Sequence, residues 1–312
     1  MLVSCNSGSQ KCKNSSQELK TLIQSYEDRE AYDKEKYPLG IYTREFYKAE
    51  AEYAESQLLS FECIKIAELS ETEQISAKLL KFVLQDQIDY YKFEQFLNPL
   101  LSDSGFHSSL NYEIRPIYNY YDAKRYLSKL NSLPEFVTQN FLNLREGLAK
   151  GVSQPKVIFT GYESTYNDHI VANFKESPFY KPFKNLPSTF TNQQKDSILT
   201  AAKEAIENTV IPQFQKIKTF FETEYLPKTR TSLGVSETPN GAAFYQNRIN
   251  FYTTSTKYTA DAIHQLGLKE VARIKAEMQT IITDLNFKGS FSDFLEFLRT
   301  DEQFYAKSPR EL

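Results

Sequence analysis

The chain has 312 residues, of which 40% are hydrophobic and 25% charged, and its formal net charge is −3. These fractions are ordinary for a globular protein, and so small a negative charge provides no field that attracts nucleic acid, which excludes nucleic acid as a partner. No apolar run approaches the ~20 residues of a membrane helix. With only 10 glycines and 12 prolines, the composition predicts a mainly α fold. The patterns along the chain, taken in order below, predict roughly eight to ten helices.

The first 18 residues resemble a lipid-anchored tether. Leu2 to Cys5 match the pattern that precedes the lipidated cysteine of bacterial lipoproteins, and residues 6–18 are polar. A signal peptide also needs a basic segment and an apolar segment, yet only four residues precede Cys5. Either the start codon is assigned too late or the match is chance. In the first case Cys5 is lipidated and the lipid is the only membrane contact.

Three cysteines are too few for a disulfide framework. If Cys5 is acylated, Cys12 and Cys63 could pair in an oxidising periplasm. The simpler interpretation, which we prefer, is that Cys63 is a buried small hydrophobic residue.

The N-terminal part of the chain has helical patterns with charged faces over residues 16–32 and 42–69. Ser70 and Glu73 form a capping box, because the serine hydroxyl can accept from the backbone of Glu73 while the carboxylate reaches back. This box predicts the start of a third helix, which ends before Pro99.

Residues 98–121 form a tyrosine-rich connection, and connections of this length tend to be functional or mobile. Helices are predicted over 121–130 and 134–150, and a further one over 155–174. Three prolines with interleaved aromatic residues then exclude a helix interior over 174–191, which predicts a packed loop or lid.

The last third of the chain changes pattern twice. A helix over 196–225 contains Pro212, which predicts a kink. A Pro-Asn-Gly turn precedes residues 245–254, and the aromatic and β-branched residues there predict a small β element. Apolar residues at helical spacing then predict a long amphipathic helix over 260–285 and a short one over 291–298.

The histidines give no sign of a metal site. A zinc peptidase of the zincin type needs two histidines one helical turn apart with a glutamate between them. His107, His169 and His264 each lack a histidine four residues away. There is also no nucleophile elbow and no phosphate-binding glycine loop. We therefore predict no catalytic residue and no metal ligand in this chain.

The best candidates for ligand contact are Tyr245, Arg248, Tyr252 and Thr253, with His264 as a further pocket residue. An arginine beside tyrosines can hold a peptide carboxylate while the rings cover its side chains. In an extended segment Arg248 and Tyr252 share one face, whereas Tyr245 and Arg248 do not. The alternatives are an arginine paired within the fold and a partly buried histidine that satisfies a backbone group.

Several of these motifs resemble one large bacterial family, known as domain of unknown function 885, whose members are often lipoproteins. The motifs are Tyr225-Leu226-Pro227 with Arg230, Pro239-Asn240-Gly241 with Tyr245, Tyr252-Thr253-Thr254, Ile263 to Met278, Arg125 to Pro134 and Gly147 to Pro155. Members are similar to mostly helical zincin metallopeptidases, and their zinc-binding helix lies in the second half of the protein.

The resemblance implies that residues 19–312 are the N-terminal, substrate-covering half of a zinc metallopeptidase of the bacterial cell envelope. Its substrate would be a peptide, and its zinc would be held beyond Leu312, so this chain alone would be inactive. The alternative is a lipid-tethered helical binding module without chemistry. A large apolar patch exposed in residues 200–312 would favour the first.

Overall fold

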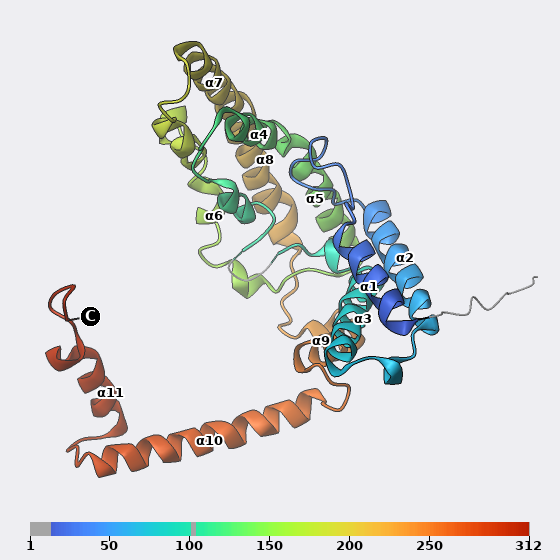
Figure 1. The fold of residues 1–312 in the computed structure, drawn as a ribbon. Coiled ribbons are helices and arrows are strands. Elements are labelled where there is room, and N and C mark those ends of the chain that lie inside the picture. The colour runs from blue at the N-terminus through green and yellow to red at the C-terminus, as the bar shows by residue number, and fades with distance from the viewer. Residues whose placement is uncertain (1–13, 101–103, 312) are drawn as a thin grey trace, which may run out of the picture. The chain divides into compact units, whose positions relative to one another are not determined.

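The computed structural model describes residues 14–100 and 104–311. It confirms the mainly α class, because helices make up most of both ranges and the only β pairing within them is two isolated bridges. The chain divides into two compact units, an N-terminal unit of residues 1–244 and a C-terminal unit of residues 245–312. Figure 1 shows the helices of each unit.

Three helices begin the N-terminal unit: α1 (Ser15–Glu27), α2 (Arg44–Ser60) and α3 (Glu71–Lys92). The predicted tether of residues 1–18 is too long, because the Asn14 side chain accepts from the Gln17 backbone and caps α1 at Ser15. Cys5 lies outside the described residues. The three helices enclose a small core of their own, made of Leu19, Leu22, Ala54, Phe61, Ile64, Leu69, Ala77, Leu80 and Leu84.

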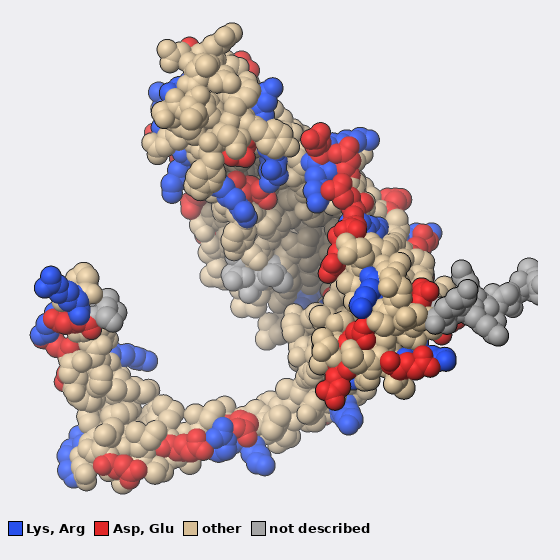
Figure 2. Space-filling model, in the orientation of Figure 1, with Lys and Arg blue, Asp and Glu red and all other residues tan. Residues whose placement is uncertain are grey.

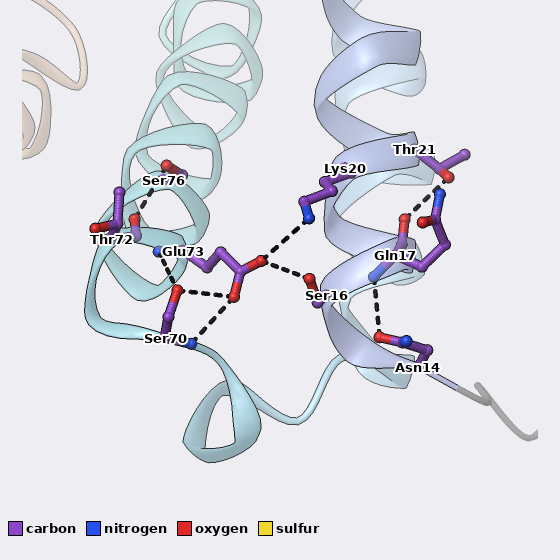
Figure 3. A network of polar contacts seen from close by, with 9 residues as sticks. All are labelled: Asn14, Ser16, Gln17, Lys20, Thr21, Ser70, Thr72, Glu73 and Ser76. Atoms are coloured by element: carbon purple, nitrogen blue, oxygen red, sulfur yellow. Dashed lines mark hydrogen bonds and ion pairs between the residues drawn. The ribbon is translucent and has the colours of Figure 1, made fainter.

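The predicted capping box is confirmed and also joins two helices (Figure 3). Ser70 Oγ accepts from the Glu73 backbone, and the Glu73 carboxylate accepts from the Ser70 N–H at 3.1 Å. The same carboxylate accepts from Ser16 Oγ on α1 and lies 3.7 Å from Lys20 Nζ. The hydroxyls of Ser16 and Ser70 lower the pKa of Glu73 to about 2, so the contact between α1 and α3 depends on an ionised carboxylate.

A larger core fills the rest of the N-terminal unit. It is surrounded by α4 (Tyr120–Asn131), α5 (Leu133–Ala149), α6 (Ser164–Asn167), α7 (Asn192–Ala205) and α8 (Ile211–Phe220). Its centre is aromatic: the rings of Phe141 and Phe220 stack at 4.1 Å, and those of Tyr166 and Phe221 at 5.8 Å. The predicted helix over 196–225 is interrupted by a π-helical turn over Ile206–Val210, just before Pro212.

The helix predicted over 155–174 is wrong. The structure has a 3-10 turn at Lys156–Phe159 and then the single-turn α6. Gly161, with φ of 77°, separates them, and Tyr162 and Tyr166, which follow it, are buried in the aromatic core. The prediction for 174–191 is better: Pro178–Asn185 forms a 3-10 segment that buries Phe179 and Phe183. The backbone conformation of both segments is determined by the packing of their aromatic side chains. Helical periodicity in the sequence gives no information on this packing.

The β element predicted near 245–254 is wrong, because these residues belong to α9 (Gly241–Thr253). The turn chemistry before it is correct, since Asn240 has φ of 57°. At Gly241 a Cβ would lie 1.8 Å from the Val235 carbonyl oxygen, so only glycine fits. Strand preference is a weak prior that helical hydrogen bonding and burial of Ile249 override here.

The C-terminal unit contains the rest of α9 and two further helices, α10 (Ala260–Asp284) and α11 (Phe291–Thr300), which confirm the predicted helices. After α10 the rings of Phe287, Phe294 and Phe297 pack together within 5.1–6.1 Å. None of the helices in the described ranges is both long enough and apolar enough to cross a bilayer.

Cys63 corrects another expectation. It is half-buried and disulfide-bonded, so the interpretation as a simple buried thiol is wrong. The other two cysteines of the sequence, Cys5 and Cys12, lie outside the described residues.

Two glycines predict opposite effects of the same substitution. A Cβ on Gly147 in α5 would lie 2.6 Å from the Leu97 carbonyl oxygen and 3.0 Å from that of Val152, whereas one on Gly267 in α10 would meet nothing within 4 Å. We expect Gly147→Ala to destabilise the protein by about 1–3 kcal/mol through overpacking. Gly267→Ala is the matched control and should stabilise α10 by roughly 0.5–1 kcal/mol. Thermal unfolding measures both, and equal effects would contradict this description.

Candidate functional site

The tyrosines and arginine predicted to contact a ligand lie together on α9. Tyr245, Arg248 and Tyr252 are three and four residues apart, so all three share one helical face. The expectation that Tyr245 and Arg248 point to opposite faces is wrong, because it assumed a strand. Tyr252 is 79% exposed and Tyr245 46% exposed, so both rings are accessible to a ligand.

Two of the predicted contact residues, Arg248 and Thr253, already have contacts within the fold. The Arg248 guanidinium donates to Asn247 Oδ1 and lies 4.7 Å from the centre of the Phe251 ring. Thr253 Oγ1 donates to the Ile249 carbonyl at 2.7 Å, in the last turn of α9. His264, in the second turn of α10, is exposed, so the alternative of a partly buried histidine is wrong. The groups on this face that are most accessible to a ligand are therefore the rings of Tyr245 and Tyr252, because the Arg248 guanidinium already has contacts within the fold.

The other two histidines are buried in the aromatic core of the N-terminal unit. His107 Nε2 lies 2.9 Å from Thr165 Oγ1, whose own proton goes to the Tyr162 carbonyl, so Nε2 carries the hydrogen. Burial, assisted by His169, lowers the pKa of His107 to about 3. Burial also lowers the pKa of His169. Both rings are therefore neutral at pH 7.

Metal ligands do not gather anywhere in the described ranges. Over residues 14–100 and 104–311, no three side chains of His, Cys, Asp or Glu lie close enough to hold a metal ion.

Two of the sequence motifs meet at a junction that is structural. The Arg230 backbone N–H donates to Ser153 Oγ at 3.1 Å, and its Nε donates to the Ser153 carbonyl at 2.8 Å. The Gln154 N–H donates to the hydroxyl of Tyr225, a ring that is fully buried. Burial raises the pKa of Tyr225 to about 12. The arginine and the tyrosine thus tie the end of the α8 region to the segment after α5.

A groove that sequence reasoning missed lies between the segment of residues 32–42 and α4, with a volume of about 760 Å³. Its walls include Lys124 and Arg125 from α4, and the ion pair of Lys129 with Glu113. Acidic and basic side chains also alternate over the visible face of this unit (Figure 2), so no field of one sign dominates. The tyrosine-rich connection was the only signal in the sequence, since Tyr121 at its end lines the groove.

Comparison with known proteins identifies relatives by fold and by family. The crystal structure of "the putative lipoprotein from Colwellia psychrerythraea" is similar to this chain, with a TM-score of 0.73 and 18% sequence identity. The similarity covers 96% of this chain but 54% of the Colwellia chain, so this chain spans about half the length of that protein. A search of curated proteins found no match. The model of the family described as "Bacterial protein of unknown function (DUF885)" matches residues 28–312, and the chain therefore belongs to this family.

Proposed function

We propose that this chain is the N-terminal, substrate-covering part of a zincin-like peptidase whose zinc site is formed by residues that follow Leu312. The proposal is supported by membership of the family and by the Colwellia protein, of which this chain matches 54%. The substrate would be a peptide, held in part by the tyrosine face of α9.

The observation that carries the proposal is an apolar stripe along α10. We use the name α10 stripe for Ile263, Gly267, Val271, Ile274, Met278, Ile281 and Leu285, which are spaced by three or four residues. Val271 is 66% and Ile281 55% exposed. Among the described residues of the C-terminal unit, 245–311, the buried apolar side chains are Ile249, Ile282 and Phe294 alone.

An exposed stripe of this length favours a partner surface, because large contiguous apolar patches usually mark interaction sites. The partner we propose is the following part of the same polypeptide. The Colwellia protein supports this choice, because nearly half of it has no counterpart in this chain.

The coding sequence provides a first test. We expect an in-frame continuation after codon 312 that encodes a helix with two histidines four residues apart and a glutamate between them. A stop codon directly after codon 312 would contradict the proposal, and the interpretation as a lipid-tethered binding module would replace it.

We also propose that the protein is a lipoprotein of the bacterial envelope, lipidated at Cys5. The Leu2–Cys5 pattern, the disulfide bond of Cys63 and the description of the Colwellia protein support this location, since disulfides persist in oxidising compartments. Metabolic labelling with palmitate tests it in the source bacterium. Label should enter the wild type and not Cys5→Ala, and equal labelling of both would exclude lipidation at Cys5.

A further inference from the structure

The N-terminal unit contains a second, smaller pocket, whose lining includes acidic side chains but no basic ones. It has a volume of about 360 Å³, within the range of small-ligand sites of roughly 300–1,000 Å³. Its lining consists of Tyr26, Phe46, Tyr47, Glu50, Val83, Asp86, Gln87 and Tyr90. Four aromatic rings and two carboxylates thus line it, without any lysine or arginine.

The lining side chains come from rigid helical elements. Phe46, Tyr47 and Glu50 lie on one face of α2, and Val83, Asp86, Gln87 and Tyr90 lie on one face of α3, which packs against α2. Tyr26 comes from the last turn of α1. We call the four rings of Tyr26, Phe46, Tyr47 and Tyr90 the aromatic cage. A site built on helices holds its geometry better than one built on loops.

The polar groups at the pocket are arranged for a hydrogen-bond donor. Glu50 accepts from Arg29 Nη1 at 2.8 Å and from Gln87 Nε2 at 3.0 Å, so its charge is already balanced. The carbonyl oxygen of the same Gln87 side-chain amide, Oε1, is buried and accepts no hydrogen bond from the described residues. A buried carbonyl oxygen without a donor is unfavourable, and a ligand N–H in the pocket would satisfy it.

We propose that this pocket binds a primary ammonium group. Aromatic ring faces attract cations, and a lining without any lysine or arginine does not repel them. An ammonium also carries the N–H donors that Gln87 Oε1 needs, which a quaternary ammonium lacks. The group could belong to a lysine side chain, to a peptide N-terminus or to an ethanolamine head group, all of which share this chemistry.

The test is isothermal titration of residues 1–312 with n-butylammonium, n-butyltrimethylammonium and, as an anion control, butyrate. We expect n-butylammonium to bind best and butyrate not at all. Gln87→Met should remove the preference for the primary ammonium, a loss of about tenfold, because methionine matches the glutamine in size but has no carbonyl. Binding of butyrate as tight as that of n-butylammonium would overturn the proposal.

Variants of the cage separate binding from folding. Tyr26→Leu should weaken n-butylammonium binding roughly five- to tenfold, whereas Tyr26→Phe keeps the ring and should retain it. Tyr121→Leu, at an exposed tyrosine of the larger groove, is the matched control and should bind normally. Equal binding by Tyr26→Leu and wild type, with both folded by circular dichroism, would contradict the cage.

Three further probes identify the source of the ammonium group. They are Nα-acetyl-lysine amide for the side chain, glycylglycine amide for the peptide terminus and glycerophosphoethanolamine for the lipid head group. The tightest of the three names the physiological class, and failure of all three, together with n-butylammonium, overturns the site. None of these measurements depends on zinc or on peptide hydrolysis, so the pocket and the proposed peptidase function can fail separately.

Discussion

Replacing Val271 and Ile274 together by glutamate is expected to abolish peptidase activity of the complete gene product and to destabilise it by at least about 3 kcal/mol. The proposed partner of the α10 stripe covers both side chains, so the substitution would bury two charges without counterions. In residues 1–312 alone both side chains are exposed. There the same double variant should change the melting temperature little.

The matched control is Ala276→Glu. Ala276 is exposed on α10, nearly opposite to the stripe, so its replacement should be tolerated in both polypeptides. Thermal unfolding and a peptide hydrolysis assay measure the effects. If the stripe variant behaves like Ala276→Glu in the complete product, the stripe is not covered and the proposed partner surface is wrong.

Acid should destabilise the protein between pH 6.5 and about 3 through the buried histidines. Burial lowers the pKa of His107 to about 3 in the folded state, while the unfolded chain keeps a value near 6.5. The unfolded state therefore binds more protons within this window, and the free energy of unfolding falls as the pH falls. The slope for one histidine is about 1.4 kcal/mol per pH unit. His169 adds to it in the same direction, because burial lowers its pKa as well.

His107→Gln isolates this contribution. The glutamine amide can still donate to Thr165 but does not titrate, so the variant should lose less stability than the wild type between pH 7 and pH 4.5. The difference should reach a few kcal/mol, on the order of 2–3. His264→Gln, at an exposed histidine, should follow the wild type. Urea unfolding at a series of pH values gives the result, and parallel curves for His107→Gln and wild type would refute it.

Local signals in the sequence were sufficient for some elements. The Ser70–Glu73 box and the regular apolar repeat of 260–285 predicted α3 and α10, because caps and amphipathic periodicity act within a few residues. The class of fold followed from the same repeats. The family resemblance rested on short motifs. Two of these motifs are joined by the hydrogen bond from Arg230 to the Ser153 carbonyl, a contact that the spacing of the motifs in the sequence does not reveal.

Other features depend on contacts between distant residues. The segment 245–254 has strand-like composition, yet burial of Ile249 and the fit at Gly241 make it helical. Residues 155–174 have a helical pattern, but their aromatic side chains fill the core from an irregular backbone. The aromatic cage combines Tyr26 with Tyr90, residues from different helices, and no sequence pattern links them. Their proximity follows only from how α1, α2 and α3 pack.

The zinc content of two purified polypeptides tests the proposed function most directly: residues 1–312, and the complete product of the reading frame that contains them. We predict roughly one equivalent of zinc and chelator-sensitive peptide hydrolysis in the complete product, and neither in residues 1–312. The contrary result is stoichiometric zinc in residues 1–312 that is lost when His107, His169 or His264 is replaced. It would place the metal site within this chain and refute its role as the covering half.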